Sequence, residues 1–244
     1  MARLQSICPV GIPQHVIQRG NNRQVCFNAD EDFAAYAHWL KAYANKCHVQ
    51  VHAWVFMTNH VHLLLTPTQE NAVSQMMQSL GRCYVRYYNK TYRRSETLWE
   101  GRFKSCLGES AEYLLQCYRY IELNPVRASM VADPSEYHWS SYKSNGLGIY
   151  TPLIAPHNEY LRLGDSDEAR LHHYRQLFKY HLDDNIITEI RDSVNKGLVL
   201  GSDKFKDEIE FNLKRRVRAG TAGRKPKEMT PITHGNIING INGR

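Results

Sequence analysis

Four short stretches in the first 108 residues combine apolar positions with the length of a strand, and some alternate apolar with polar side chains. Successive side chains point to opposite faces of a strand, so these stretches predict strands that bury at least one face. The predicted strands are residues 15–20, 49–57, 60–66 and 98–108. Thr58 and Asn59 predict a tight turn between the second strand and the third.

Three longer segments of the same region repeat their apolar positions at helical spacing, and they predict helices at residues 29–47, 71–93 and 110–124. Acidic residues at 30–32 suit the positive N-terminal end of the first helix. Ser110 is suited to cap the third helix. Pro125 predicts its end, because the residue before a proline is disfavoured in helical geometry.

The predicted elements follow the order β-α-β-β-α-β-α, and the first six match the split βαβ arrangement of ferredoxin-like folds. We therefore predict an α+β protein with a ferredoxin-like antiparallel sheet and helices, followed by a mainly helical C-terminal region. The third helix is expected to lie against the sheet.

The C-terminal region predicts three further helices, at residues 167–182, at 186–197 with Gly197 as its stop, and from Ser202 onward. The short connector before Ser202 and the basic residues after the last helix leave two alternatives open. The helices could form a DNA-binding module like a helix-turn-helix, or a packed pair with a phosphate-binding tail. We expect a first domain at 1–145, a helical accessory region at 146–218 and a basic flexible tail at 219–244.

Composition narrows the class of protein. Hydrophobic residues make up 42% of the 244 positions, which is enough for a sizeable core. The six cysteines are scattered without a C-x-x-C pair, so we expect reduced thiols and no zinc ribbon or disulfide framework. No apolar stretch has the length of a membrane span, and the first residues lack the apolar core of a signal peptide. A cytoplasmic protein with no membrane partner is expected.

The formal net charge of +7 is concentrated near the C-terminus. Residues 214–244 contain eight Lys or Arg and one acid, whereas residues 1–213 contain 23 of each sign. A second basic concentration lies in residues 81–104. Two basic surfaces predict a polyanion partner, although a solvated face would explain either run alone. The basic residues expected to contact nucleic acid are Arg82, Arg86, Lys90, Arg102, Lys104, Lys214, Arg215, Arg216 and Arg218.

His60 and His62 are two residues apart in a predicted strand, so both should point to the same face. Two imidazoles at this spacing can converge on one cation. Two histidines that only hydrogen-bond to polar neighbours are the commoner arrangement. A metal site also needs a third ligand from elsewhere in the chain.

Tyr120 and Asn124 are four residues apart on the third predicted helix and should share one face. An amide oxygen is a suitable ligand for Mg²⁺ or Mn²⁺. A tyrosine beside such a cation can act as a nucleophile on a phosphodiester that the cation polarises. The chain has 15 tyrosines, among them Tyr113 and Tyr118 on the same helix, and most tyrosines only pack.

Four stretches, in order, resemble those of the HUH single-tyrosine transposases, and most closely the bacterial REP-associated tyrosine transposases. They are "HVIQRGNNRQ", "HAWVFMTNHVHLLL", "GRFKS" and "RYIELNPVRASMV". The resemblance covers about residues 10–145 and makes residues 1–145 the expected catalytic domain. It implies a divalent metal, Mg²⁺ or Mn²⁺, held by His60, His62 and Asn124. Many relatives have Gln at the position of Asn124, so direct metal contact by the shorter side chain is left open.

The resemblance further implies that Tyr120 cuts single-stranded or REP-type hairpin DNA through a 5′-phosphotyrosine intermediate and then transfers the strand. An unpaired substrate suits the aromatic and basic composition near residues 82–104. The polar turn after the first strand is a second expected DNA contact, through Arg19, Asn21, Asn22 and Arg23, although it also fits a simple hairpin-like turn.

Two other functions compete with a DNA-nicking transposase. One is a non-catalytic nucleic-acid-binding protein on a ferredoxin-like sheet, and the other is a different metal-dependent hydrolase. The expected setting is a bacterial, nucleoid-associated cytoplasmic protein that acts as a monomer or homodimer.

Overall fold

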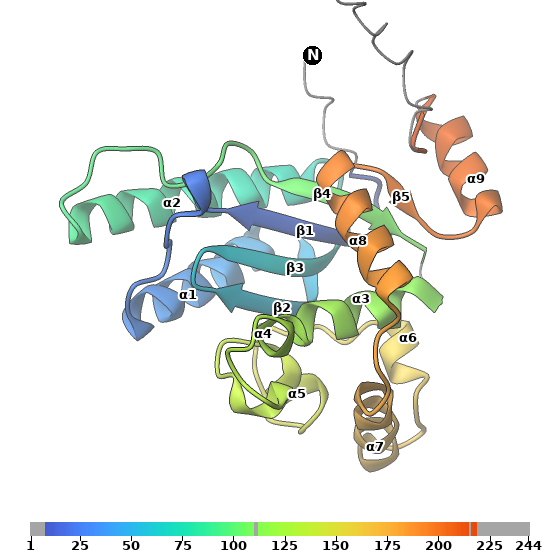
Figure 1. The fold of residues 1–244 in the computed structure, drawn as a ribbon. Helices are drawn as coiled ribbons and strands as arrows, with labels where there is room; N and C mark the ends of the chain where they lie inside the picture. The colour runs from blue at the N-terminus through green and yellow to red at the C-terminus, as the bar shows by residue number, and fades with distance from the viewer. Residues whose placement is uncertain (1–7, 110–111, 215, 219–244) are drawn as a thin grey trace, which may run out of the picture.

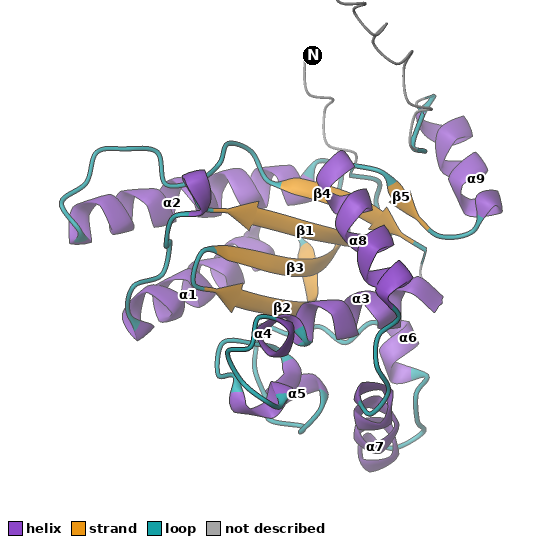
Figure 2. Ribbon diagram, in the orientation of Figure 1, coloured by secondary structure: helices purple, strands orange, loops and turns teal. Residues whose placement is uncertain are grey.

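A five-stranded sheet with helices on both faces forms the centre of the molecule (Figures 1 and 2). It is seen in a computed structural model that describes residues 8–109, 112–214 and 216–218. The strand order is β2-β3-β1-β4-β5. The strands are β1 (Gln14–Arg19), β2 (Val49–Met57), β3 (His60–Pro67), β4 (Lys104–Gly108) and β5 (Val199–Leu200).

The first four strands are antiparallel and follow the ferredoxin-like order, which confirms the predicted fold class. β5 adds a short parallel strand beside β4, so the sheet is mixed. The segment "LVLG", predicted only as a connector, therefore contributes a strand. This strand lies between the two predicted helices, and whether the region binds DNA stays a prediction.

One face of the sheet is covered by α1 (Asp30–Lys46) and α2 (Ala72–Thr91) (Figure 1). Rings such as Tyr36 and Tyr84 are fully buried between these helices and the sheet. The buried carboxylate of Asp32, at the start of α1, accepts hydrogen bonds from the hydroxyls of Tyr87 and Tyr92. These bonds fix the end of α2 against the beginning of α1.

The opposite face is covered by α3 (Glu112–Glu122) and α8 (Asp184–Lys196), which lie in front of the sheet in Figure 1. α8 packs against β4 and β1, so the predicted accessory region contributes both a strand and a covering helix to the sheet. The expected division near residue 145 stays a prediction.

Smaller helices surround this second core (Figure 2). They are η1 (Asn21–Arg23), α4 (Asn124–Arg127), η2 (Pro134–Glu136), α5 (Tyr142–Asn145), α6 (Asn158–Leu161), α7 (Asp167–Phe178) and α9 (Asp203–Leu213). Gly197 ends α8 with φ of 69°, as its predicted role requires. The hydroxyl of Ser202 caps α9 by accepting from the Phe205 amide. None of the helices in the described ranges is long and apolar enough to cross a membrane.

The predicted strand at 98–108 is interrupted. β4 begins only at Lys104, whose partner in β1 is Ile17, and an isolated bridge joins Trp99 to Gly20. Residues 100–103 therefore span the interval opposite Gln18 and Arg19 and bulge away from the ladder. Two extra residues on one side of a pair force such a bulge.

The predicted helix at 110–124 is also shorter than expected. α3 ends at Glu122, and Asn124 begins the separate short helix α4. Pro125 has no amide hydrogen to continue the α3 ladder, but its fixed φ suits the first turn of a new helix. Ser110 lies outside the described residues. The predicted helix at 167–182 likewise ends early, at Phe178.

Candidate active site on the α3 face of the sheet

His60 and His62 lie side by side in β3, on the face covered by α3. The β1–β3 register pairs Arg19 with His60 and Ile17 with His62. The two imidazole centroids are 5.0 Å apart, with the rings nearly perpendicular. Val61, between them, is buried in the core on the other face. The prediction that both histidines share one face is confirmed.

Each of the two rings uses Nδ1 in a hydrogen bond. Nδ1 of His60 is 2.6 Å from Oδ1 of Asn59, and Nδ1 of His62 is 2.8 Å from Nε2 of His15. A metal-binding imidazole needs a free lone pair on one nitrogen while the other nitrogen donates its proton to a partner. With Nδ1 protonated, both rings would present the lone pair of Nε2.

His15 is a site residue that the sequence analysis missed. It lies in β1, two residues before Ile17, so its side chain shares the face of His62. The two rings are stacked with centroids 5.0 Å apart. In the sequence, only its position inside the motif "HVIQRG" pointed to a role for His15. His15 and His62 become neighbours through the pairing of β1 with β3, which the sequence does not show directly.

The histidines at this site favour the neutral form. Burial, with the charge of Arg19, lowers the pKa of His60 to about 4. Burial, reinforced by Arg127, lowers the pKa of His15 to about 3. Burial is also the main reason that the pKa of His62 is well below its ordinary value, with His60 and His15 adding to the effect. Neutral imidazoles are the form that binds a metal.

Tyr120, from α3, lies against this group. Its ring centroid is 5.7 Å from that of His62 and 5.6 Å from that of His15. The guanidinium of Arg127 lies 4.2 Å from the Tyr120 ring centroid, and its Nη2 donates to the Tyr120 carbonyl oxygen at 2.8 Å. Arg127 was part of the motif "NPVRA" but was not predicted as a site residue. The turn into α4 brings it back over Tyr120.

The other tyrosines of α3 face different surroundings. Tyr118 is fully buried, with ring centroids 6.1 Å from Tyr160 and 6.0 Å from Tyr174, and burial raises its pKa well above the ordinary value. Tyr113 is partly buried and packs at the edge of the same core. Of the three tyrosines, Tyr120 is the one that contacts the histidines.

The remaining donor predicted for a metal is the amide of Asn124, half-buried at the start of α4. In the described ranges there is no group of three or more His, Cys, Asp or Glu side chains suited to a metal ion. A metal here would therefore need an amide or another ligand type beside the two histidines. Two imidazole nitrogens and an amide oxygen fit Mn²⁺, and Mg²⁺ through the oxygen.

The predicted polar turn lies at the same end of the site. Gly20 donates its amide to the Asn59 carbonyl at 2.8 Å, and Asn59 Nδ2 donates to the Arg23 carbonyl at 3.2 Å. Asn22 and Arg23 are exposed and adopt positive φ values of 49° and 59°. Arg19 and Asn21 are half-buried. The turn and the two histidines thus share one edge of the molecule.

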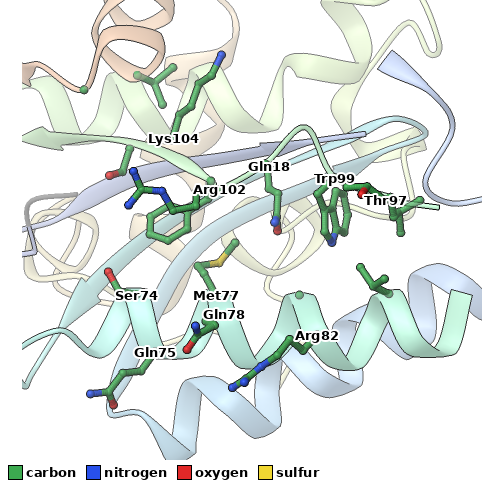
Figure 3. Close-up of a pocket in the computed structure, with 18 of the residues that line it drawn as sticks. Gln18, Ser74, Gln75, Met77, Gln78, Arg82, Thr97, Trp99, Arg102 and Lys104 are labelled. Carbon is green, nitrogen blue, oxygen red and sulfur yellow. The ribbon is translucent and has the colours of Figure 1, made fainter. Parts of the chain in front are cut away.

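The other predicted DNA contacts lie elsewhere. Arg82, Arg86 and Lys90 are exposed on α2, on the opposite face of the sheet from Tyr120. Arg82 and Arg86 line a large cleft together with Arg102 and Lys104 (Figure 3). Arg82 and Arg86 are therefore separated from Tyr120 by the thickness of the sheet. Lys104 instead pairs with Ile17 and donates from Nζ to Asn195 of α8, on the face that α3 covers.

The C-terminal basic residues differ from one another in their surroundings. Lys214 and Arg216 are exposed, and Arg215 lies outside the described residues. Arg218 is bound by carboxylates of its own chain, with ion pairs to Asp203, Asp207 and Glu210 at 3.6, 2.7 and 3.0 Å. Its charge is already compensated within the fold, although the predicted DNA contact stays a prediction.

Comparison with known families agrees with this arrangement of motifs. Residues 10–124 match the model of the family described as "Transposase IS200 like". This segment is similar to the IS200-like transposases. The resemblance noted from the sequence is confirmed at this level, and the matched IS200-like region contains β1 to β4, both histidines and Tyr120. Search of the curated proteins gives no match.

Of two similar solved structures, the first supports the fold of the matched region. A REP-associated tyrosine transposase bound to a REP hairpin is similar, with a TM-score of 0.51 and 17% identity over 68% of this chain and 96% of that chain. A transposase candidate from Deinococcus radiodurans R1 has a TM-score of 0.34 and 17% identity, over 53% of this chain and 89% of that one.

Proposed function

We infer that the protein is a single-stranded DNA endonuclease and strand transferase whose nucleophile is Tyr120. The observation that supports this most is the contact of the buried Tyr120 ring with His62, beside His60, in the segment that matches the IS200-like model. A core tyrosine has no need of two adjacent neutral imidazoles. A tyrosine that cleaves a phosphodiester does need them, because a cation held by neutral imidazoles can stabilise the charge that develops on the phosphate and on the leaving oxygen.

The reaction exchanges one phosphodiester for another. The Tyr120 oxygen, losing its proton, bonds to the scissile phosphorus, and the bond to the 3′ oxygen breaks. That oxygen takes up a proton, which leaves a 5′-phosphotyrosine and a free 3′-hydroxyl. Attack by a second 3′-hydroxyl reverses the exchange and joins a new end, so no ATP is consumed.

The chain's own residues prepare this step. Arg127 holds the Tyr120 ring and the carbonyl of the same residue, which limits the rotation of the nucleophile. His15 orients His62 through the 2.8 Å contact between their nitrogens. His60, His62 and Asn124 would hold a divalent Mg²⁺ or Mn²⁺ ion, which supplies Lewis-acid stabilisation of the phosphate when bound.

The proposed substrate is REP-type hairpin DNA with unpaired flanks. The hairpin assignment rests on the similar transposase, which was solved with a REP hairpin. Asn22 and Arg23, exposed on the turn next to the histidines, offer side chains that can hold the strand near Tyr120.

The test is formation of a covalent protein–DNA adduct. Single-stranded DNA that carries a REP-type hairpin with unpaired flanks would be incubated with the protein and Mn²⁺ and then denatured. We expect an adduct with the natural protein, with Tyr118→Phe and with Tyr113→Phe, and none with Tyr120→Phe. Loss of the adduct in Tyr118→Phe with retention in Tyr120→Phe would overturn the assignment. DNA binding without any adduct would favour a non-catalytic binder.

A second arm examines the histidines. Replacing His60 and His62 together by Ala should abolish Mn²⁺-dependent adduct formation while the protein still folds. A double variant whose folded fraction remains active would show that the pair does not serve the reaction.

A further inference from the structure

A large cleft lies on the face of the sheet away from Tyr120, between α2 and the segment 95–105 (Figure 3). Its volume is about 1080 Å³, at the upper end of the range for sites that bind small organic molecules. The interruption of the sheet at residues 100–103 forms one wall, and α2 forms the other. Neither wall contains a residue of the candidate active site.

Two buried side chains leave polar atoms unpaired in this cleft. Gln18 and Trp99 are 7% and 5% exposed, and both point from the sheet toward α2 (Figure 3). Gln18 Oε1 and Trp99 Nε1 have no hydrogen-bond partner among the described residues. A buried polar atom without a partner is destabilising, so a ligand that pairs with both atoms would remove that penalty.

Gly81, on α2, leaves space next to the Gln18 side-chain amide and the Trp99 indole N–H. A Cβ at this position of α2 would lie 3.8 Å from Gln18 Nε2 and 3.9 Å from Trp99 Nε1. A longer side chain would therefore occupy the place where a ligand can reach the two unpaired atoms. An acceptor and an N–H donor side by side match the edge of a nucleobase, which presents both kinds of group.

The rim of the cleft matches a phosphate backbone. Its cationic lining residues are Arg82, Arg86, Arg102, Lys104 and Lys196, and Glu96 is the only carboxylate among the described lining residues. Sites that bind single-stranded nucleic acid typically combine cationic side chains with aromatic rings on which bases stack. Phe103, half-buried on the interrupted segment, adds such a ring.

Residues of the segment 101–104 line both the cleft and a small hollow on the tyrosine face. The hollow is lined by Ile17 and Arg19, which lie on the histidine face of β1. The hollow and the cleft share Gly101, Arg102, Lys104 and Asn195. A strand could thus pass from Arg19 around this segment without crossing the sheet.

We propose that the cleft binds an unpaired base of the DNA strand that is cut at Tyr120, with the base edge on Gln18 and Trp99 and the phosphates on the basic rim. The inference rests on the proposed function for the identity of the ligand. It adds a base-binding site on the opposite face of the sheet, so that the enzyme would hold one strand at two separated places.

The test compares two probes of equal charge in EDTA, where no cleavage occurs: a 12-residue oligothymidylate and a 12-residue abasic oligonucleotide. Stacking and pairing of one base are worth about tenfold or more in affinity, so the full-length protein should prefer oligothymidylate by at least about tenfold. Gln18→Leu should reduce this preference at least about fivefold and change affinity for the abasic strand less than about twofold.

Gln14→Leu is the matched control. Gln14 is a buried glutamine on the same face of β1 that does not line the cleft, so its replacement should leave the preference intact. Gly81→Leu should act like Gln18→Leu if it folds, as checked by circular dichroism. A Gln18→Leu protein with the natural preference would overturn the inference, as would equal loss in Gln14→Leu.

Adduct formation separates this inference from the proposed function. If Tyr120 forms the adduct but base preference does not depend on Gln18, only the cleft assignment fails. If preference depends on Gln18 but no adduct forms, the cleft is a nucleic-acid site and the nuclease assignment fails.

Discussion

The buried carboxyl of Glu122 should make folding stability fall as pH rises. Glu122 is fully buried on α3, where it accepts hydrogen bonds from Ser141 Oγ, Asn145 Nδ2 and Tyr174 Oη at 2.5, 2.8 and 2.7 Å. Burial nevertheless dominates and raises the pKa from 4.5 to about 7. The three bonds tie the helix of Tyr120 to α5, α7 and the preceding loop.

The sign and size of the change in folding stability follow from the difference in proton binding between the folded and unfolded states. The folded state holds the Glu122 proton more tightly than the unfolded state, so its stabilisation is present at low pH. It is lost as pH rises from about 4.5 to about 7. Between pH 5 and pH 8 the loss is about 2.5 kcal/mol. Glu122→Gln removes the titrating group, so the variant should gain about 2.5 kcal/mol relative to the natural protein over that interval.

Urea unfolding at pH 5, 6, 7 and 8 in EDTA measures this difference. Buried histidines lose stability at low pH in both proteins, so their contribution cancels in the comparison. Glu208→Gln, at an exposed position of α9, is the control and should show no trend. A difference between Glu122→Gln and the natural protein that is constant with pH, or that moves the opposite way, would refute the reasoning.

Three other perturbations have definite expected outcomes. His15→Leu should lower metal affinity by about 10–100-fold, measured by calorimetry, because His62 loses its orienting partner; unchanged affinity would exclude that role. Arg127→Lys should slow adduct formation and lower stability by about 1 kcal/mol, since lysine cannot both cover the Tyr120 ring and bind its carbonyl; kinetics and urea unfolding check both. Deleting residues 219–244 removes four basic residues and should flatten the single-strand salt slope by up to about 3 without moving the cut; an unchanged slope would show that the tail does not touch DNA.

Local patterns predicted the sheet well. The strand at 49–57 has the predicted bounds, and the turn at Thr58 and Asn59 places His60 and His62 as expected. Both results depend on the alternation of side chains along a single strand, which can be read directly from the sequence. The element order was sufficient for the ferredoxin-like topology, because only a few arrangements satisfy it.

Contacts between distant segments were harder to predict. His15 and Arg127 join the site through β1–β3 pairing and through the turn into α4, and neither feature has a local signature. The interruption at residues 100–103 could not be predicted, because the residues before and after it both have the pattern of a strand. β5 is only two residues long, too short to show a period.

The order of the strands in the chain has a consequence for synthesis on the ribosome. Tyr120 and both histidines precede residue 145, but the partner of β4 is β5, which ends at residue 200. At about 5–20 residues per second, the interval between these two points is about 3–11 s. During it the edge of β4 lacks its neighbour, and an open edge pairs readily with other chains. We expect messages truncated in this interval to yield aggregates rather than folded protein.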